Sequence, residues 1–236
     1  PDGKPTVVSA GNLSSSSLRV EWLPPNRNTI HGEFLGYRVK YRKHGPTLGL
    51  EREITLRDPD LRSYTLRSLE PFTEYMISLQ IFNPAGEGPA TAVTATTDEG
   101  MSSPPRNVSL VRVTNTMARL QWLEPKAANG RLQGYRIYVL NIAANLTEVK
   151  KWLEPKAANG RLQGYRIYVL NIAANLTEVK KVVNPQQYST DFTLNNLKPF
   201  SQYKVWVKAY TMKTEGESSK TLEFRTDVTG PSAPLI

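Results

Sequence analysis

One set of landmarks occurs twice along this chain in the same order. Each set contains a tryptophan, a Gly-Tyr pair and a Leu-x-Pro-x-x-x-Tyr motif. The sets are Trp22, Gly36-Tyr37 and Leu69 to Tyr75, then Trp122, Gly134-Tyr135 and Leu197 to Tyr203. Each tryptophan ends a stretch of alternating apolar and polar residues, and each last tyrosine begins another. Such alternation is typical of half-buried β-strands, and a tyrosine at such a corner is a feature of β-sandwiches.

The spacing of these runs predicts the class of fold and its division into domains. Seven short strands separated by turn residues indicate an all-β protein of two tandem seven-stranded sandwiches. We expect Trp22, Tyr75, Trp122 and Tyr203 to be structural residues, with both tyrosine hydroxyls bonded back to the chain. We place the domains at residues 1–98 and 106–227, a linker at 99–105, and the start of a further linker at 228–236.

A segment of the second domain is repeated without change, as residues 122–151 and 152–181. The interval from Trp122 to the corner tyrosine exceeds that of the first domain by about one copy, so the sandwich needs only one. Two copies with no difference do not resemble an old structural repeat, and we favour an error in the sequence over a real insertion. If both are present, Tyr135 and Tyr165 compete for one core position, and the losing copy is expected to form an exposed loop.

The charge and the amino-acid composition limit the classes of function that this chain can have. The chain carries a net charge of +9 and no cysteine. One copy of the repeat supplies five basic and two acidic residues, so part of this excess comes from the duplication. Such an excess suits solubility or an anionic partner and does not itself indicate nucleic acid.

No nucleophile, base or metal-ligand set can be assembled, so we expect no catalytic, cofactor-binding or metal-binding residues and no enzyme in this segment. No apolar run is long enough to span a bilayer. We see no signal peptide and interpret the chain as part of a longer protein.

Two kinds of surface residue are candidates for modification or binding. Asparagines in N-x-[ST] sequons are predicted glycosylation sites: Asn12, Asn107, Asn145 and Asn175. We expect Asn145 to lie in a loop, and the side chain of Asn107 to point outward because strand residues alternate.

The second kind is a run of cations. Arg38, Lys40 and Arg42 alternate along one predicted strand, and Lys43 follows. They form either a solvated strand face or a binding patch for a sulfated glycosaminoglycan.

The landmarks resemble those of fibronectin type III domains, and the first domain adds the Gly86-x-Gly88-Pro89 turn. The resemblance covers both domains nearly end to end. The stretch from His31 to Tyr37 is similar to its counterpart in neural immunoglobulin-superfamily adhesion molecules and receptor-type protein tyrosine phosphatases. The duplication departs from the family pattern and puts the middle strands of the second domain in doubt.

The resemblance implies an extracellular spacer and protein-recognition segment from the ectodomain of a single-pass, membrane-anchored receptor at the cell surface. Its partners would be a protein ligand or co-receptor, and the parent protein would carry any phosphatase domain in the cytoplasm. The alternatives are an intracellular structural array, which the lack of cysteine permits, and a heparan-sulfate-binding adhesion module. The ligand, the parent receptor family and the oligomeric state stay open.

Overall fold

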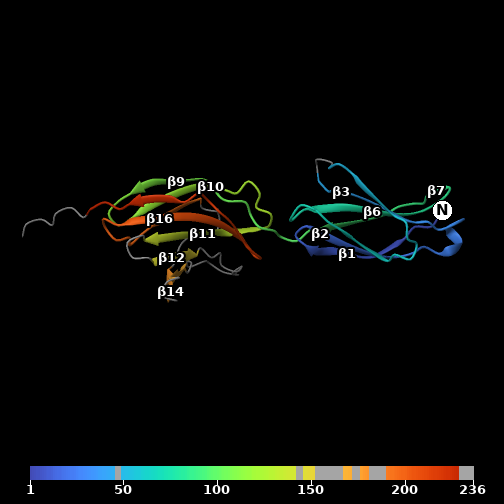
Figure 1. Ribbon diagram of the computed structural model, residues 1–236, viewed down its shortest axis with the longest axis horizontal. Helices are drawn as coiled ribbons and strands as arrows, with labels where there is room; N and C mark the ends of the chain where they lie inside the picture. The colour runs from blue at the N-terminus through green and yellow to red at the C-terminus, as the bar shows by residue number, and fades with distance from the viewer. Residues whose placement is uncertain (46–48, 142–145, 152–166, 172–175, 181–189, 229–236) are drawn as a thin grey trace, which may run out of the picture. The chain divides into compact units, whose positions relative to one another are not determined.

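The computed structural model describes residues 1–45, 49–141, 146–151, 167–171, 176–180 and 190–228. The chain divides into two compact units, Pro1–Gly100 and Met101–Ile236. Each unit is a β-sandwich built of antiparallel strands (Figure 1). The predicted all-β class with two tandem sandwiches is therefore confirmed.

The first unit packs a three-stranded sheet against a larger one. The smaller sheet has the order β1 (Thr6–Ser14), β2 (Ser17–Leu23) and β5 (Ser63–Leu66). The larger sheet has the order β4 (Arg52–Leu56), β3 (Gly36–Lys43), β6 (Glu74–Asn83) and β7 (Gly86–Glu87), and β8 (Thr91–Thr96) also pairs with β6. The short strands β7 and β8 share one edge of β6 and together take the place of the seventh strand.

The second unit repeats this plan and adds strands at one edge. Its smaller sheet has the order β15 (Asp191–Leu194), β10 (Ala118–Leu123) and β9 (Arg106–Val113). In its larger sheet, β11 (Leu132–Asn141) pairs with β16 (Gln202–Thr211), which pairs with β17 (Glu215–Ser218) and β18 (Leu222–Arg225). Beyond β11 the sheet continues through β12 (Leu146–Lys151), β13 (Ile167–Asn171) and β14 (Leu176–Lys180).

Each core is centred on an aromatic pair. Trp22 is 1% exposed, and its ring meets that of Tyr37 edge to face with centroids 5.1 Å apart. Trp122 and Tyr135 form the same contact at 5.2 Å. The apolar residues that alternate along the flanking strands are buried around these rings. Period-two alternation thus places one face of each strand inside the sandwich.

Tyrosine corners close both sandwiches in the same way. The backbone N–H of Glu70 donates to the hydroxyl of Tyr75 at 2.9 Å, and the N–H of Lys198 donates to the hydroxyl of Tyr203 at 2.8 Å. A threonine hydroxyl donates to the carbonyl of the same corner residue in each unit: Thr97 to Glu70, and Thr226 to Lys198, both at 2.6 Å. The motif predicted the tyrosines, whereas the threonines lie too far along the chain to be recognised.

The duplicated segment does not behave as expected from the sequence. The first copy holds the core position, because Tyr135 is 3% exposed and β11 pairs with β16. The second copy does not form only a loop, since its strands β13 and β14 extend the same sheet from β12. Identical sequence forms an identical hairpin, and the free edge of β12 offers the backbone groups to which that hairpin pairs. Tyr165 lies outside the described residues.

Candidate recognition surface

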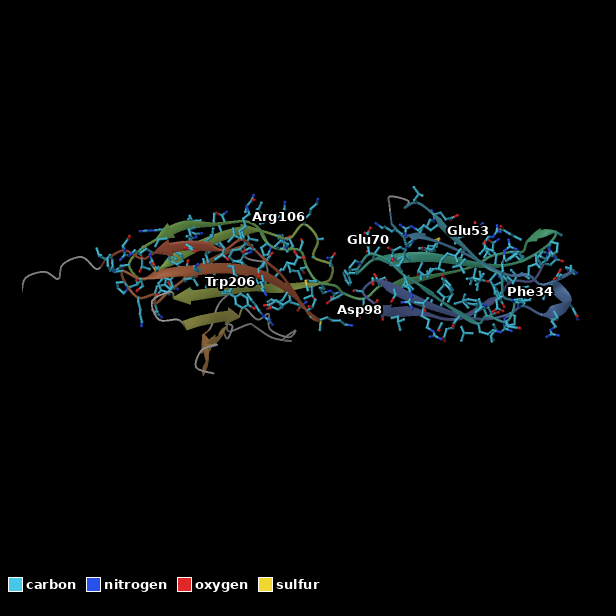
Figure 2. All side chains as sticks on the ribbon, in the orientation of Figure 1. Phe34, Glu53, Glu70, Asp98, Arg106 and Trp206 are labelled. Atoms are coloured by element: carbon cyan, nitrogen blue, oxygen red, sulfur yellow. The ribbon has the colours of Figure 1, made fainter. Side chains whose placement is uncertain are left out.

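The outward face of the larger sheet carries charged clusters in both units. In the first unit, Arg38 and Lys40 on β3 meet Glu53 on β4 and Glu87 on β7. The Nε of Arg38 lies 3.2 Å from Glu53, and the Nζ of Lys40 lies 3.2 Å from Glu87. Arg38 also donates to Glu87. Figure 2 labels Glu53 on this sheet. Two of the four predicted binding cations are therefore shared between carboxylates, which lowers the positive potential that they offer to a polyanion.

The electrostatics of Glu87 follow from this cluster. Burial acts to raise the pKa of Glu87, but hydrogen bonds from Lys40 and Arg38 and their charges outweigh it. The pKa therefore lies below its ordinary value, and the carboxylate is charged at neutral pH. The ion pairs of this cluster connect the side chains of three strands, β3, β4 and β7.

The other two predicted cations border a cleft at the end of β3. Lys43 pairs with Glu70 of the tyrosine corner, and Arg42 donates to the sulfur of Met76 at 3.7 Å. The cleft has a volume of about 240 Å³, and Arg52 brings a third cation to it. The four residues predicted as one patch thus divide. Arg38 and Lys40 share Glu53 and Glu87, whereas Arg42 and Lys43 lie beside the cleft, with Lys43 itself paired to Glu70.

The second unit has a different outward face. Tyr138 on β11 and Trp206 on β16 stack with ring centroids 5.4 Å apart and planes 5° apart. Both side chains are partly exposed, and Trp206 is labelled in Figure 2. The Nζ of Lys208 lies 5.4 Å from the centre of the Tyr138 ring. Glu215 accepts hydrogen bonds from the Tyr138 hydroxyl and, at 3.2 Å, from Arg136.

The Tyr138 hydroxyl is held in its protonated form. Burial raises its pKa, the hydrogen bond to Glu215 and the charge of that carboxylate raise it further, and the pKa reaches about 12. The hydroxyl is therefore a donor throughout the physiological range, and it fixes the ring that stacks on Trp206.

The two units share one arrangement on the outward face of the larger sheet and differ beside it. Both have an arginine on the Gly-Tyr strand that bonds a glutamate and covers an aromatic ring. The shared pairs are Arg38 with Glu87 and Phe82, and Arg136 with Glu215 and Tyr210. The register then places Lys40 opposite Ser78 in one unit, where the other has Tyr138 opposite Trp206. The aromatic pair is thus special to the second unit, which makes it the candidate recognition surface.

Sequence reasoning did not find this aromatic pair. A signal was present, because Tyr138 and Trp206 occupy outward positions of strands whose inward positions are apolar. Two large aromatic residues at solvent-facing positions are unusual unless they bind something or cover each other. Their pairing required the register between β11 and β16, which a single strand does not reveal.

The predicted glycosylation sites fall on different parts of the structure. Asn12 is exposed on β1, and Asn107 is exposed on β9, where its backbone has a φ of 49°. Asn145 and Asn175 lie outside the described residues. Two sequons thus have side chains open to solvent.

Within the described ranges, no group of three or more His, Cys, Asp or Glu residues is placed to hold a metal ion. The described part of the chain has no helix that is long and apolar enough to cross a bilayer.

Two tandem sandwiches with tyrosine corners define a class of modular β-proteins. The model of the fibronectin type III domain matches residues 3–97 and 144–225, which is more than half of the chain. The chain belongs to the fibronectin type III family. In the second domain the matched residues, 144–225, include the whole second copy of the repeat. In the structure, however, the core residues come from β11 of the first copy.

Similar proteins are receptors and adhesion molecules. A putative receptor-type tyrosine-protein phosphatase, mosPTP-1 of Aedes aegypti, is 37% identical over the whole chain, which covers 16% of that protein. The cell adhesion molecule DSCAML1 of Gallus gallus is 30% identical over the whole chain, which covers 10% of it. The chain therefore spans a small part of these relatives. Among solved structures, a segment of two fibronectin type III domains from chicken tenascin is 20% identical, with a TM-score of 0.40; the match covers 95% of this chain and all of that one.

Proposed function

We propose that this chain is an extracellular spacer and protein-recognition segment of a single-pass cell-surface receptor, and that the parent is a receptor tyrosine phosphatase. The supporting observation is the similarity over the whole chain to a receptor-type phosphatase and to adhesion molecules. The segment itself is not an enzyme in this proposal. Its family is one of binding and spacing domains, and any phosphatase domain lies elsewhere in the parent protein.

The flanking sequence tests the identity of the parent. Extending the transcript on both sides should reveal a membrane-spanning helix and, beyond it, a phosphatase domain. More fibronectin domains with neither of these would instead support an intracellular array.

A second measurement uses the sequons: the chain secreted from animal cells should lose mass on treatment with an N-glycosidase. Asn12→Gln and Asn107→Gln should each remove one glycan, and Asn145→Gln and Asn175→Gln test the other two sites.

Protein recognition is assigned to the Tyr138–Trp206 pair. Tryptophan and tyrosine dominate binding energy at interfaces because they bury large rigid surfaces with few rotatable bonds. Fluorescent tetramers of the chain should bind cells that display the ligand, and Trp206→Ala should weaken this binding by about tenfold or more. Met212→Ala is the matched control, because Met212 is 79% exposed and stands outside the stack. Equal binding by both variants would remove the pair from the interface.

Heparan sulfate binding is a second candidate, supported by the cleft beside Arg42. Arg42 and Arg52 border it together with Lys43, whose charge is shared with Glu70, and closely spaced cations attract a sulfated chain. Arg42→Ala combined with Arg52→Ala should elute from a heparin column at lower salt than the wild type. Arg38→Ala with Lys40→Ala should shift elution less, since those cations already face Glu53 and Glu87. Unchanged elution of the first variant would leave the solvated face as the interpretation.

A further inference from the structure

The larger sheet of the second unit ends at an unusual strand. Within the described part of the chain, β14 is the last strand of this sheet and pairs only with β13. An edge strand presents a row of unpaired N–H and C=O groups, and these are a template for another strand. Natural proteins usually block such an edge with proline, a bulge, a cover or charged side chains. The two charged residues of β14, Glu178 and Lys180, are of opposite sign and can face each other in a symmetric pair. Residues 176–180 contain no proline, and the ladder between β13 and β14 runs without a register shift.

The same sequence already accepts a strand elsewhere in the structure. Residues 146–150 of β12 and residues 176–180 of β14 are identical. They also pair in the same register with the strand before them: Val149 lies opposite Tyr138, and Val179 lies opposite Tyr168. The outer edge of β12 is occupied by β13 through antiparallel pairing. The outer edge of β14 therefore has the sequence and the backbone alternation of an edge that binds a strand in this molecule.

The partner that can pair with this edge without breaking any existing strand pairing is the β14 strand of a second molecule. Pairing β14 with the β13 strand of a second molecule would first require that hairpin to leave its own β12. Two β14 edges can meet with every existing ladder intact, in an antiparallel arrangement related by a twofold axis. Such an isologous contact closes after two copies and does not propagate into a fibre.

The register of this contact follows from strand geometry. Alternate residues direct their backbone groups to opposite edges, so only residues that share an edge can lie opposite one another. In a symmetric pair the axis must therefore pass through a residue position. An axis at Glu178 or at Lys180 places like charges opposite each other, which is destabilising. An axis at Val179 instead places Glu178 of each copy opposite Lys180 of the other, giving two pairs of opposite charge.

We propose that β14 is a self-pairing edge through which two copies of this chain form a dimer, with the twofold axis at Val179. The two larger sheets then become one continuous sheet. This dimer is independent of the proposed ligand surface, and it requires that both copies of the repeat are present in the protein.

Charge reversal on the full chain tests this register. The chain, with an intact mass of 26.5 kDa before glycosylation, should sediment as a dimer. Lys180→Glu puts a second glutamate opposite Glu178 at both symmetric positions, and it should weaken dimerisation by about tenfold or more. Lys150→Glu is the matched control: it makes the same change at the same place in the first copy, but on β12, which is not an edge. This control should dimerise like the wild type.

A mixing experiment separates the proposed contact from a general effect of charge. Glu178→Lys and Lys180→Glu should each be mainly monomeric alone, because each creates two like-charge pairs. An equimolar mixture should form heterodimers, since every lysine then faces a glutamate. The double variant with both substitutions should dimerise again. A monomeric wild type, a mass lower by one copy of the repeat, or unchanged dimerisation of both single variants would each overturn the proposal.

Discussion

At the scale of residues, the two units are held by the same few contacts. A buried tryptophan lies against the tyrosine of the Gly-Tyr strand, and a corner tyrosine accepts a backbone N–H five residues before it in each unit. The Trp–Tyr contact joins the two sheets of each sandwich, and the tyrosine contact fixes the corner that precedes β6 or β16. Removing one of them should therefore destabilise a whole sandwich.

Trp22 gives the simplest measure of this contribution. Its side chain is among the largest fully buried ones, so Trp22→Ala leaves a cavity that the surrounding strands cannot fill. The free energy of unfolding of the first unit should fall by about 3–5 kcal/mol in denaturant melts. A loss below about 1 kcal/mol would contradict the burial of this residue.

Glu87 should make the stability of the first unit depend on pH. Its folded pKa is lowered, so its contribution is fully present above the ordinary pKa of glutamate and is lost as the pH falls through the folded pKa. Glu87→Gln should cost about 1 kcal/mol at neutral pH and progressively less in acid. Glu51→Gln is the control, because Glu51 is exposed and forms no ion pair with the described residues. A cost for Glu87→Gln that did not change with pH would show that the charge of Glu87 is not its cause.

At the scale of elements, the duplicated hairpin is the feature that distinguishes this chain from a regular tandem of sandwiches. Strands β11 and β12 complete the sheet, and β13 and β14 repeat their pairing at the edge (Figure 1). Within the duplicated segment, the core residues that the structure describes are Tyr135, Ile137 and Val139, and all three lie on β11 of the first copy. Because β11 already fills these core positions, we expect the second hairpin to be dispensable for them.

Removing one copy tests this conclusion. Deleting residues 122–151 or residues 152–181 gives the same sequence, because the copies are identical and adjacent. The shortened chain should fold, and the second unit should unfold at the same or a higher temperature because a competitor for the core position is gone. Loss of the folded second unit, seen by circular dichroism, would mean that the extra hairpin has a structural role.

At the scale of the whole molecule, the question is whether both copies of the repeat exist in the protein. The sequence alone favours an error, because two copies without a single difference show no divergence. The structure nevertheless accommodates both copies in one sheet.

Intact-mass spectrometry decides between these possibilities. The chain with both copies has a mass of 26.5 kDa before glycosylation. The proposed dimer predicts this value, because only a chain with both copies has β14. A mass lower by one copy would support an error in the sequence and would leave a regular second domain.

Much of the fold was predictable because its signals are local. Period-two alternation identified the inward residues around Trp22 and Tyr75, and the Leu-x-Pro spacing identified both corners. The cations on β3 were also recognised, but their partners were not. Glu53 and Glu87 come from two other strands, so their contact with Arg38 depends on sheet order and register.

The sequence by itself determined which residues face the cores, where the corners lie and that two sandwiches follow one another. These features depend on the chemistry of neighbouring residues within one strand or turn. Only the tertiary structure decided which copy of the repeat enters the core, how the cations are neutralised and that Tyr138 stacks on Trp206. Those outcomes depend on pairing between distant strands, and two identical segments carry no local information by which one could be chosen over the other.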